Sequence, residues 1–577
     1  MTTEAGFLGL LGPLVEAYAE VLETLAAARA AWVRLDEPAL VEDRGDDDLA
    51  ALRRAYERLG GSRDRPAIVV STYFGHVRSA MPVLAELPVE GVGLDLCRGE
   101  EKLALLGDAG GLGDKVLFAA VVDGRNVWRA DLEAALGLVE QLGDLAGEVV
   151  VSTSRSLLHV PLGLGSEVAL DDEVRPWLAF AEEKLDELAT LAPGGRPRGA
   201  GRWPTNWRPT GRRWRTAPPF SPPVWDCHPC PRPPSGRSTR PQRCAPPGPP
   251  GGPGRSTAPA TRRCCGPRST RSSPASPSAT TWCATSPGSC RDSCCPQRVG
   301  SSPTARAAGG PVIFGDVARS APVTLAWARY ARSRTAKPVK GMLTGPITML
   351  RWSFVRDDLP DAEVAAQLGL AMRDELVDLQ SASVGVIQVD EPALREGLPL
   401  RAAEYPGYLA WATRAFRLVT SAAEPATQIH THMCCARLGD IVAALGDIDV
   451  DVVSLEAARS KMAVVDELAD IGYLGAVGRG VYDVHAPSVP GGAELEARLR
   501  RAVGALGPWR LWVNPDSGLK TRSYDEVVPA LSHLLAAVRT LRAELASDGI
   551  PPQGEDRGHS SMAGPGRGPG EKADHGR

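Results

Sequence analysis

The sequence lacks the features that would place it in a membrane or direct it out of the cell. It contains no run of about eighteen apolar residues, the length that a membrane-spanning helix needs. Its N-terminus, Met-Thr-Thr-Glu-Ala-Gly, has neither the basic nor the apolar segment of a secretory signal peptide. Charge of neither sign is in excess, since the net charge is −4 and the pI about 6.2. We therefore expect a soluble cytoplasmic enzyme with no nucleic-acid or membrane partner.

The middle of the chain lacks the residues that build a hydrophobic core. Between Gly194 and Gly310 there is no Leu, Ile, Met, Tyr, Glu or Lys, while Pro, Arg, Ser, Gly and Cys dominate. Such a composition cannot bury enough apolar surface to offset the entropy lost on folding. We therefore predict that residues 193–310 are disordered.

Cysteine is scarce outside this segment, which holds nine of the twelve cysteines. In a reducing cytoplasm the other three, Cys97, Cys434 and Cys435, are free thiols or metal ligands. The alternatives for the segment itself are a linker, a basic nucleic-acid tail, a zinc ribbon through Cys227 and Cys230, and a stretch translated out of frame. No second cysteine pair has matching spacing, which disfavours the zinc ribbon. A shift of one nucleotide lets residues 230–238 encode Leu-Pro-Thr-Thr-Thr-Ile-Gly-Ser-Phe, and we favour the out-of-frame interpretation.

Strand-like and helix-like pieces alternate on both sides of this segment. The predicted strands of the first half are 31–36, 67–72, 91–96, 116–122 and 148–153, and those of the second half are 339–343, 385–390, 427–432, 451–456, 474–478 and 509–514. Helical spacing between them predicts parallel sheets with helical crossovers. No Gly-rich phosphate loop follows a strand, so a doubly wound sheet is disfavoured. Many strands end in Asp, His, Glu or Asn, which is typical of the active-site edge of a (β/α)₈ barrel.

Two stretches indicate that the two halves are duplicates. Asp-Glu-Pro-Ala-Leu follows an aliphatic run at Asp36 and again at Asp390, 354 residues later (390 − 36). Asp95 and Glu456 end similar strands 361 residues apart (456 − 95), and a third pair of strands aligns at nearly the same spacing. Repetition in one order at one spacing favours duplication over coincidence. We predict two related barrels, both incomplete because fewer than eight strands are visible in each.

A cluster of metal-binding residue types follows two strands of the second half. His432 and Cys434 lie two apart in an extended segment, so their side chains point the same way. Glu456 ends the next strand, and adjacent parallel strands deliver their last residues to one mouth. Imidazole, thiolate and carboxylate are ligands that zinc prefers. Ordinary packing is the alternative for a His-x-Cys pair in a barrel strand.

These residues lie within longer motifs that resemble one family, the cobalamin-independent methionine synthases, or 5-methyltetrahydropteroyltriglutamate:homocysteine methyltransferases. The motifs, in the family's order, are "VKGMLTGPITMLRWSFVRDD", "IQVDEPALREGLPLR", "IHTHMC", "SLEAARS", "GVYDVHAPSVP" and "LWVNPDSGLKTR". The resemblance implies two (β/α)₈ barrels: a partial N-terminal one at 1–192 and a catalytic one at 311–547, followed by a disordered tail at 548–577. It also implies a monomer that uses Zn²⁺ and no cobalamin, with L-homocysteine and 5-methyltetrahydrofolate polyglutamate as substrates.

The resemblance also assigns roles to particular residues. It implies zinc ligands at His432, Cys434 and Glu456, and an amino-group ligand for homocysteine at Asp390. Glu396 and Trp352 are the implied folate contacts, and His485 is the implied proton donor. The alternatives are a helix cap for Asp390, a surface-loop role for His485 and a core role for Trp352.

The sequence departs from the family's pattern at three places. Ser517 stands where the family has its second zinc cysteine, and a hydroxyl is a weaker ligand than a thiolate. The first strands of the N-terminal barrel and the homocysteine loop of the middle segment are not found. The rival interpretations are therefore an inactive remnant that at most binds zinc or folate, and a lyase on a related barrel such as uroporphyrinogen decarboxylase. The lyase chemistry needs no zinc, so the cluster at His432 counts against it.

Overall fold

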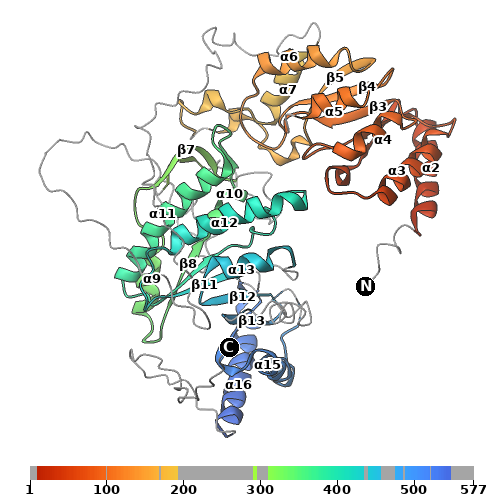
Figure 1. Cartoon of the computed structure of the whole chain (residues 1–577). Coiled ribbons are helices and arrows are strands. Elements are labelled where there is room, and N and C mark those ends of the chain that lie inside the picture. Colours follow the sequence, from red (N-terminus) through yellow and green to blue (C-terminus); the bar gives the residue numbers. More distant parts are fainter. Residues whose placement is uncertain are drawn as a thin grey trace, which may run out of the picture. The chain divides into compact units, whose positions relative to one another are not determined.

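A computed structural model of the chain shows an α/β protein built around two parallel sheets (Figure 1). It describes residues 9–98, 101–167, 170–192, 290–294, 310–433, 439–456, 473, 475–484, 486, 488–516, 518–519 and 522–547. Cys434, His485 and Ser517 lie outside these ranges, as do nearly all residues of 193–310 and the tail from 548. The boundaries of the four predicted segments therefore stay predictions.

The first sheet has five parallel strands in the order of the chain, and helices alternate with the strands. The strands are β1 (Trp32–Asp36), β2 (Ala67–Ser71), β3 (Gly91–Asp95), β4 (Val116–Val122) and β5 (Glu148–Thr153). The helices are α2 (Leu11–Ala27), α3 (Asp46–Gly60), α4 (Met81–Glu86), α5 (Lys102–Asp108), α6 (Leu132–Leu142) and α7 (Ala181–Leu191). All five strands predicted for this half are present.

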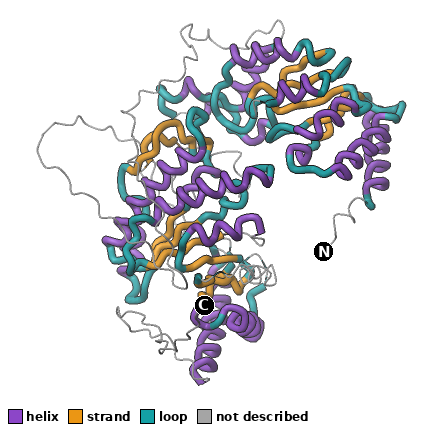
Figure 2. Tube along the Cα trace, viewed as in Figure 1, coloured by secondary structure: helices purple, strands orange, loops and turns teal. Residues whose placement is uncertain are grey.

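The second sheet has six parallel strands in the order β14-β13-β12-β11-β10-β8. Figure 2 draws strands in orange and helices in purple. They are β8 (Lys340–Thr344), β10 (Val386–Asp390), β11 (Gln428–Met433), β12 (Val452–Leu455), β13 (Ala476–Tyr482) and β14 (Leu511–Pro515). The helices are α9 (Leu325–Ser333), α10 (Pro346–Arg351), α11 (Asp361–Ser381), α12 (Tyr405–Thr420), α13 (Val442–Ile448), α15 (Gly492–Leu506) and α16 (Tyr524–Ser547). The two sheets confirm the α/β prediction, with each barrel incomplete among the described residues.

A small third sheet was not predicted from the sequence. It joins β6 (Cys290–Cys294), β7 (Val312–Arg319) and β9 (Phe354–Val355), with β6 antiparallel to β7 and β9 parallel to it. Strand β6 falls within the segment predicted to be disordered, of which the structure otherwise describes only Gly310. β9 has two residues, which is too short for a periodic pattern to reveal.

Each large sheet packs its helix-facing side into a hydrophobic core of its own. In the first half Ile68, Val92 and Leu117 come from neighbouring strands and are completely buried. In the second half Ile387 and Val453 do the same beneath helices such as α11 and α12, which lie side by side in Figure 1. Each such side chain contributes about 1.5–3 kcal/mol by leaving water. The near-continuous aliphatic strands follow from burial of parallel sheets on both faces.

The pairing register supports the duplication. Strands β1 to β5 match β10 to β14 one by one in order. The register between β4 and β5 shifts at Ala120 and Val122, and the register between β13 and β14 shifts at Gly480 and Tyr482. The two irregularities lie 360 residues apart (480 − 120), the spacing of the repeated motifs. Two sheets that share strand order and a bulge at the same place are duplicates of one unit.

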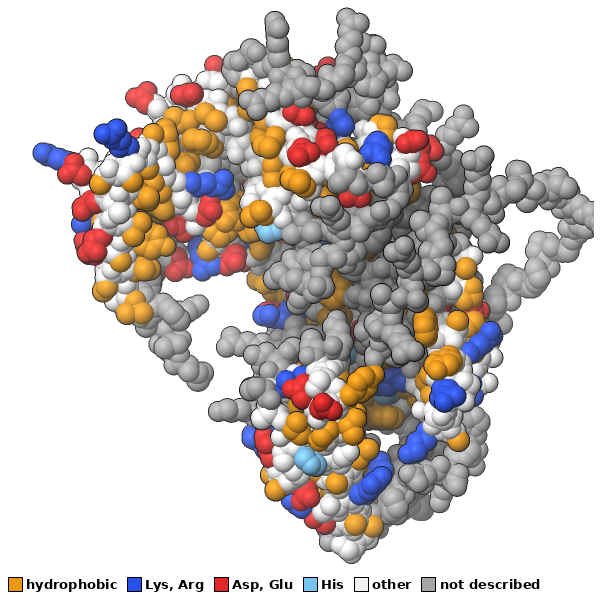
Figure 3. Space-filling model, turned by 180° about the vertical axis from the view of Figure 1, so that it is seen from behind, with side chains coloured by type: hydrophobic (Ala, Val, Ile, Leu, Met, Phe, Trp, Pro, Cys, Tyr) orange, Lys and Arg blue, Asp and Glu red, His pale blue; other side chains and the backbone are white. Residues whose placement is uncertain are grey.

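The described residues on the face drawn in Figure 3 form no continuous patch of one charge. Acidic and basic side chains alternate there, with hydrophobic ones between them (Figure 3). No helix in the described ranges combines the length and the apolar character needed to cross a membrane.

Candidate active site

Three predicted site residues lie at the carboxyl edge of the second sheet, on three neighbouring strands. Asp390 is the last residue of β10, His432 is near the end of β11, and Glu456 follows the last residue of β12. His432 pairs with Ser454 across the two strands, and Glu456 comes two positions after Ser454, just beyond the end of β12. The structure therefore places the three residues at one edge of the sheet.

The state of His432 suits a metal ligand. Burial, with a smaller effect from the charge of Lys340, lowers the pKa of His432 to about 4. The imidazole is then neutral at physiological pH and keeps the lone pair that a metal ion needs. Imidazole and the Glu456 carboxylate both belong to the ligand types of zinc. The two residues thus fit a zinc site.

The rest of the predicted ligand set cannot be placed. Cys434 and Ser517 lie outside the described residues. Within the described ranges no three His, Cys, Asp or Glu side chains group closely enough to hold a metal ion. The zinc site therefore stays a prediction that rests on His432, Glu456 and the sequence motif.

Asp390 is held between two strands. β10 pairs with β8 on one side and β11 on the other, and the Gly345 amide donates to the Asp390 carbonyl oxygen at 2.6 Å. Asp390 is partly exposed as a residue, but protein surrounds its carboxyl group. This burial raises the pKa of Asp390 to about 7. The Gln388 amide donates to Asp390 Oδ1 at 2.7 Å and, with the charge of Lys340, opposes that rise. Asp390 is therefore a carboxyl group close to its midpoint at neutral pH.

The helix cap considered for Asp390 belongs instead to its neighbour Glu391. The buried Glu391 carboxylate accepts from the amides of Ile347 at 3.0 Å and Thr348 at 2.8 Å, and from Thr348 Oγ1 at 2.8 Å. These amides lie in the first turn of α10, where no intrahelical partner exists. The carboxylate leaves no room for a side chain at Gly345, because a Cβ there would lie 2.1 Å from Glu391 Cδ.

The two residues that the resemblance implies as folate contacts, Trp352 and Glu396, follow α10 and β10. Trp352 follows the last residue of α10, is partly buried and packs against the core of the second half. Glu396 is exposed in the turn after β10. Arg351 joins the two regions, since its Nη2 donates to the Gly397 carbonyl oxygen at 3.4 Å. The packing supports a core role for Trp352, and its contact with folate stays a prediction, as does that of Glu396.

The first half has the same strand ends without the same chemistry. Asp36, the counterpart of Asp390, is exposed and bonds Arg34 at 2.6 Å. Within the described residues β1 has a pairing partner on one side only, whereas β10 has one on each side. Asp95, the counterpart of Glu456, is buried beside Lys102 at 3.5 Å. The flanking strand, rather than the motif itself, therefore decides whether the aspartate is enclosed.

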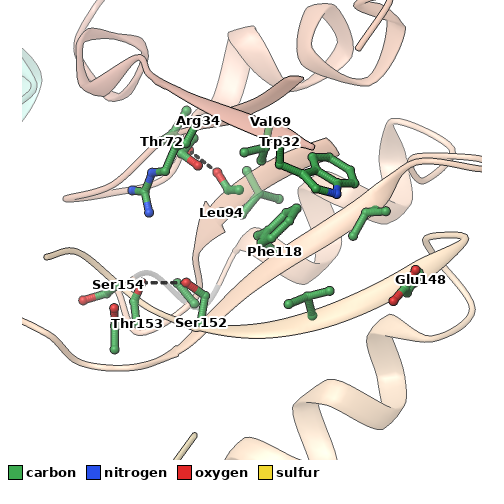
Figure 4. Close-up of a pocket in the computed structure, with 15 residues that line it drawn as sticks. Trp32, Arg34, Val69, Thr72, Leu94, Phe118, Glu148, Ser152, Thr153 and Ser154 are labelled. Atoms are coloured by element: carbon green, nitrogen blue, oxygen red, sulfur yellow. Dashed lines mark hydrogen bonds between the residues drawn. The ribbon is translucent and has the colours of Figure 1, made fainter. Parts of the chain in front are cut away.

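A cavity of about 570 Å³ lies on the inward face of the first sheet, away from the predicted catalytic strands. Side chains from opposite strands fill this space in a closed barrel, but five strands form the described sheet. Figure 4 shows aromatic and aliphatic side chains on one part of its wall and hydroxyl groups on another, among them Trp32, Val69, Leu94, Phe118, Ser152, Thr153 and Ser154. We interpret the cavity as the interior of an incomplete barrel.

Four residues of the hydrogen-bonded network that reaches Asp390 were missed in the sequence. Lys340 Nζ lies 2.8 Å from Gln388 Oε1 and 3.1 Å from His430 Nδ1, and His430 Nε2 lies 3.1 Å from Gln428 Oε1. A signal was present for three of them: polar residues occupy alternate positions of β10 and β11, at 388 and 390 and at 428, 430 and 432. Period-two polarity in a buried strand indicates an inward-facing polar network.

We expect Asp390→Asn to stabilise the protein at alkaline pH. The raised pKa means that the folded state holds the Asp390 proton more tightly than the unfolded state, so stability is lost as pH rises from about 4 to about 7. Asn cannot ionise, and the variant should gain roughly 1–3 kcal/mol over the parent at pH 8 and little at pH 4.5. Urea unfolding at the two pH values measures this difference. An equal difference at both would show that Asp390 ionises freely.

The fold and these strand ends define a class: a parallel β/α barrel enzyme whose polar residues gather at the carboxyl edge of the sheet. Two family models match the chain, "Cobalamin-independent synthase, N-terminal domain" over residues 2–147 and "Cobalamin-independent synthase, Catalytic domain" over residues 298–540. The chain belongs to the cobalamin-independent methionine synthase family and is, by family, a methyltransferase.

Several relatives match over most of the chain. A 5-methyltetrahydropteroyltriglutamate–homocysteine methyltransferase of Streptomyces avermitilis is 44% identical, covering 93% of this chain and 76% of the relative. A protein of the same name from Rhodococcus jostii is 41% identical, covering 94% and 77%. Among solved structures, a B12-independent methionine synthase from Shewanella is 21% identical with a TM-score of 0.37, covering 42% of this chain and 72% of that one.

Proposed function

We propose that the second barrel carries a site for transfer of a methyl group from 5-methyltetrahydropteroyltri-L-glutamate to L-homocysteine, giving L-methionine. The observation that carries the proposal is the placement of Asp390, His432 and Glu456 at one edge of three neighbouring strands, in a chain of the family. The relatives carry the name of this reaction. Cytoplasmic location and a monomeric state belong to the same proposal.

The described residues have distinct roles in this proposal. His432 and Glu456, together with Cys434, would hold Zn²⁺, which when bound deprotonates a substrate thiol. Asp390 presents a carboxylate to the ammonium group of homocysteine and so fixes the direction from which the sulfur approaches. Asp390 lies on β10 and His432 on the adjacent strand β11, so the sheet fixes the distance between the amino-group ligand and the zinc ligand.

The methyl donor places other demands on the chain. The methyl group leaves a tertiary amine nitrogen, which is a poor leaving group unless it gains a proton. We propose that His485 delivers this proton and that Trp352 and Glu396 contact the folate. No cobalamin is proposed, in agreement with the description of the family.

We expect no detectable methionine from the chain as it stands, because the homocysteine loop is missing from 193–310 and Ser517 replaces a zinc cysteine. Orientation of both reactants can lower the barrier by about 7–11 kcal/mol, and that contribution is lost when homocysteine binds without the loop and the zinc thiolate that fix its orientation. Restoring the reading frame between Ala192 and Arg306 together with Ser517→Cys should produce methionine from homocysteine and the triglutamate methylfolate.

The assay needs two comparisons. His485→Ala in the repaired protein should reduce turnover by roughly 100-fold or more if His485 supplies the proton. Turnover by the unrepaired chain would show that the missing loop is dispensable. If the repaired protein folds and binds zinc but forms no methionine, the result supports the alternative hypothesis, an inactive remnant of the family that only binds ligands.

A further inference from the structure

A line of hydrogen-bonded side chains runs along the second sheet to Asp390. Lys340 lies at the start of β8, opposite Val386 at the start of β10, and Asp390 lies at the other end of β10. Lys340 Nζ donates to Gln388 Oε1 at 2.8 Å, and Gln388 Nε2 donates to Asp390 Oδ1 at 2.7 Å. The line thus connects the amino edge of the sheet with the carboxyl edge, where the candidate site lies.

The chemistry of the groups gives this line one direction. An ammonium group only donates hydrogen bonds, so the Gln388 side chain must turn its oxygen toward Lys340. Its NH₂ group is then turned toward Asp390, which accepts as a carboxylate. A glutamate in place of Gln388 would meet Lys340 equally well but would face Asp390 with a second negative oxygen.

A second contact fixes Lys340. His430 Nδ1 lies 3.1 Å from Lys340 Nζ and accepts from it, so the imidazole hydrogen is on Nε2 and is donated to Gln428 Oε1 at 3.1 Å. The ring of His430 is also in edge contact with Trp512, with centroids 4.8 Å apart. Lys340 is exposed as a residue. Its amine nevertheless contacts Gln388 on β10 and His430 on β11.

The electrostatic effect of the line opposes that of burial. Burial favours the neutral form of Asp390, whereas the Gln388 hydrogen bond and the Lys340 charge favour the carboxylate. An ammonium ligand binds the carboxylate and not the neutral acid. The Gln388 contact also directs Oδ1, which leaves Oδ2 as the oxygen that a ligand would meet.

We propose that Lys340 and Gln388 are positioning residues that orient Asp390 and favour its carboxylate form for the ammonium group of an α-amino acid thiol. This inference rests on the proposed function, in which Asp390 binds the amino group of homocysteine. Lys340 and Gln388, and not Asp390 alone, then determine the selectivity for a thiol that carries an amino group.

The test compares two thiols, L-homocysteine and 4-mercaptobutanoate, which lacks the amino group. Calorimetry on the full chain under reducing conditions gives both dissociation constants, and their ratio isolates the amino group because both ligands carry the thiol and the carboxylate. The parent should prefer homocysteine, and Asp390→Asn should remove the preference. Lys340→Met and Gln388→Met should each reduce it about tenfold.

Matched variants separate positioning from damage to the fold. Lys340→Arg keeps a charged donor and should retain most of the preference, and Lys337→Met removes an exposed lysine from the preceding loop and should change nothing. Gln388→Glu should lower the preference more than Gln388→Met, because it adds repulsion to the loss of a donor. All variants should bind 4-mercaptobutanoate as the parent does.

The outcomes distinguish the two proposals. If Asp390→Asn removes the preference while Lys340→Met and Gln388→Met keep it, the role of Asp390 stands and the positioning role is wrong. If the parent does not prefer homocysteine, or binds neither thiol, the proposed role of Asp390 fails and the positioning role fails with it.

Discussion

Glu391→Ala should destabilise the second barrel by roughly 3–5 kcal/mol, on the scale observed when one member of a buried polar group is removed. The substitution leaves two amides and one hydroxyl of the first turn of α10 without their acceptor. It also leaves a hole where a side chain that is 1% exposed had been. Urea unfolding followed by tryptophan fluorescence measures the loss.

The repeated motif supplies a matched control. Glu37 is the counterpart of Glu391 in the first half and accepts a hydrogen bond from Tyr56 Oη at 2.8 Å. Since Glu37 is less buried and its side chain makes no helix-capping hydrogen bond, Glu37→Ala should cost clearly less. Glu391→Gln should also cost less than Glu391→Ala, because the amide oxygen can still accept from the helix. Equal losses for Glu37→Ala and Glu391→Ala would contradict the capping role.

Ser517→Cys should tighten zinc binding by about 100-fold or more. Loss of a residue that merely supports a metal ligand costs about 10–100-fold in affinity, and a ligand itself should count for at least as much. The parent, with His432, Cys434 and Glu456, should therefore lose zinc to a moderate chelator that the variant resists. Competition with a chromogenic chelator gives both dissociation constants without any assay of activity.

Two controls accompany this measurement. Ser532→Cys places the same thiol on an exposed position of α16 and should leave zinc affinity unchanged. His432→Ala in the Ser517→Cys protein should weaken binding again, because the neutral imidazole is lost. Equal affinity of the parent and the Ser517→Cys protein would place Ser517 away from the metal.

The strands of both large sheets could be predicted because parallel strands that are buried on both faces are aliphatic. All eleven predicted strands are present, from β1 to β5 and in the six-stranded sheet. β7 was missed because its eight residues, Val312–Arg319, have neither a continuous apolar run nor a regular alternation. The six residues of helix α10 are too few for helical spacing to show in the sequence.

The environment of the site could not be predicted, because it depends on pairing between distant strands. Asp36 and Asp390 occupy the same pentapeptide, yet one is exposed and the other is enclosed. The difference comes from β8, which ends 46 residues before Asp390 in the chain (390 − 344) and pairs with β10 in the sheet. The same pairing of β8 with β10 brings Lys340 within hydrogen-bonding distance of Gln388, which contacts Asp390.

The register irregularity that the two sheets share indicates the order of events in the evolution of this chain. A bulge re-aims the residues that follow it, and the shift at Ala120 has its counterpart at Gly480. An irregularity found in both descendants was already present in their single-barrel ancestor, before the gene doubled. Among the described residues, the enclosed aspartate and the lysine beside Gln388 both lie in the second half. Enclosure of Asp390 between β8 and β11 is therefore a difference set within an architecture that both halves share.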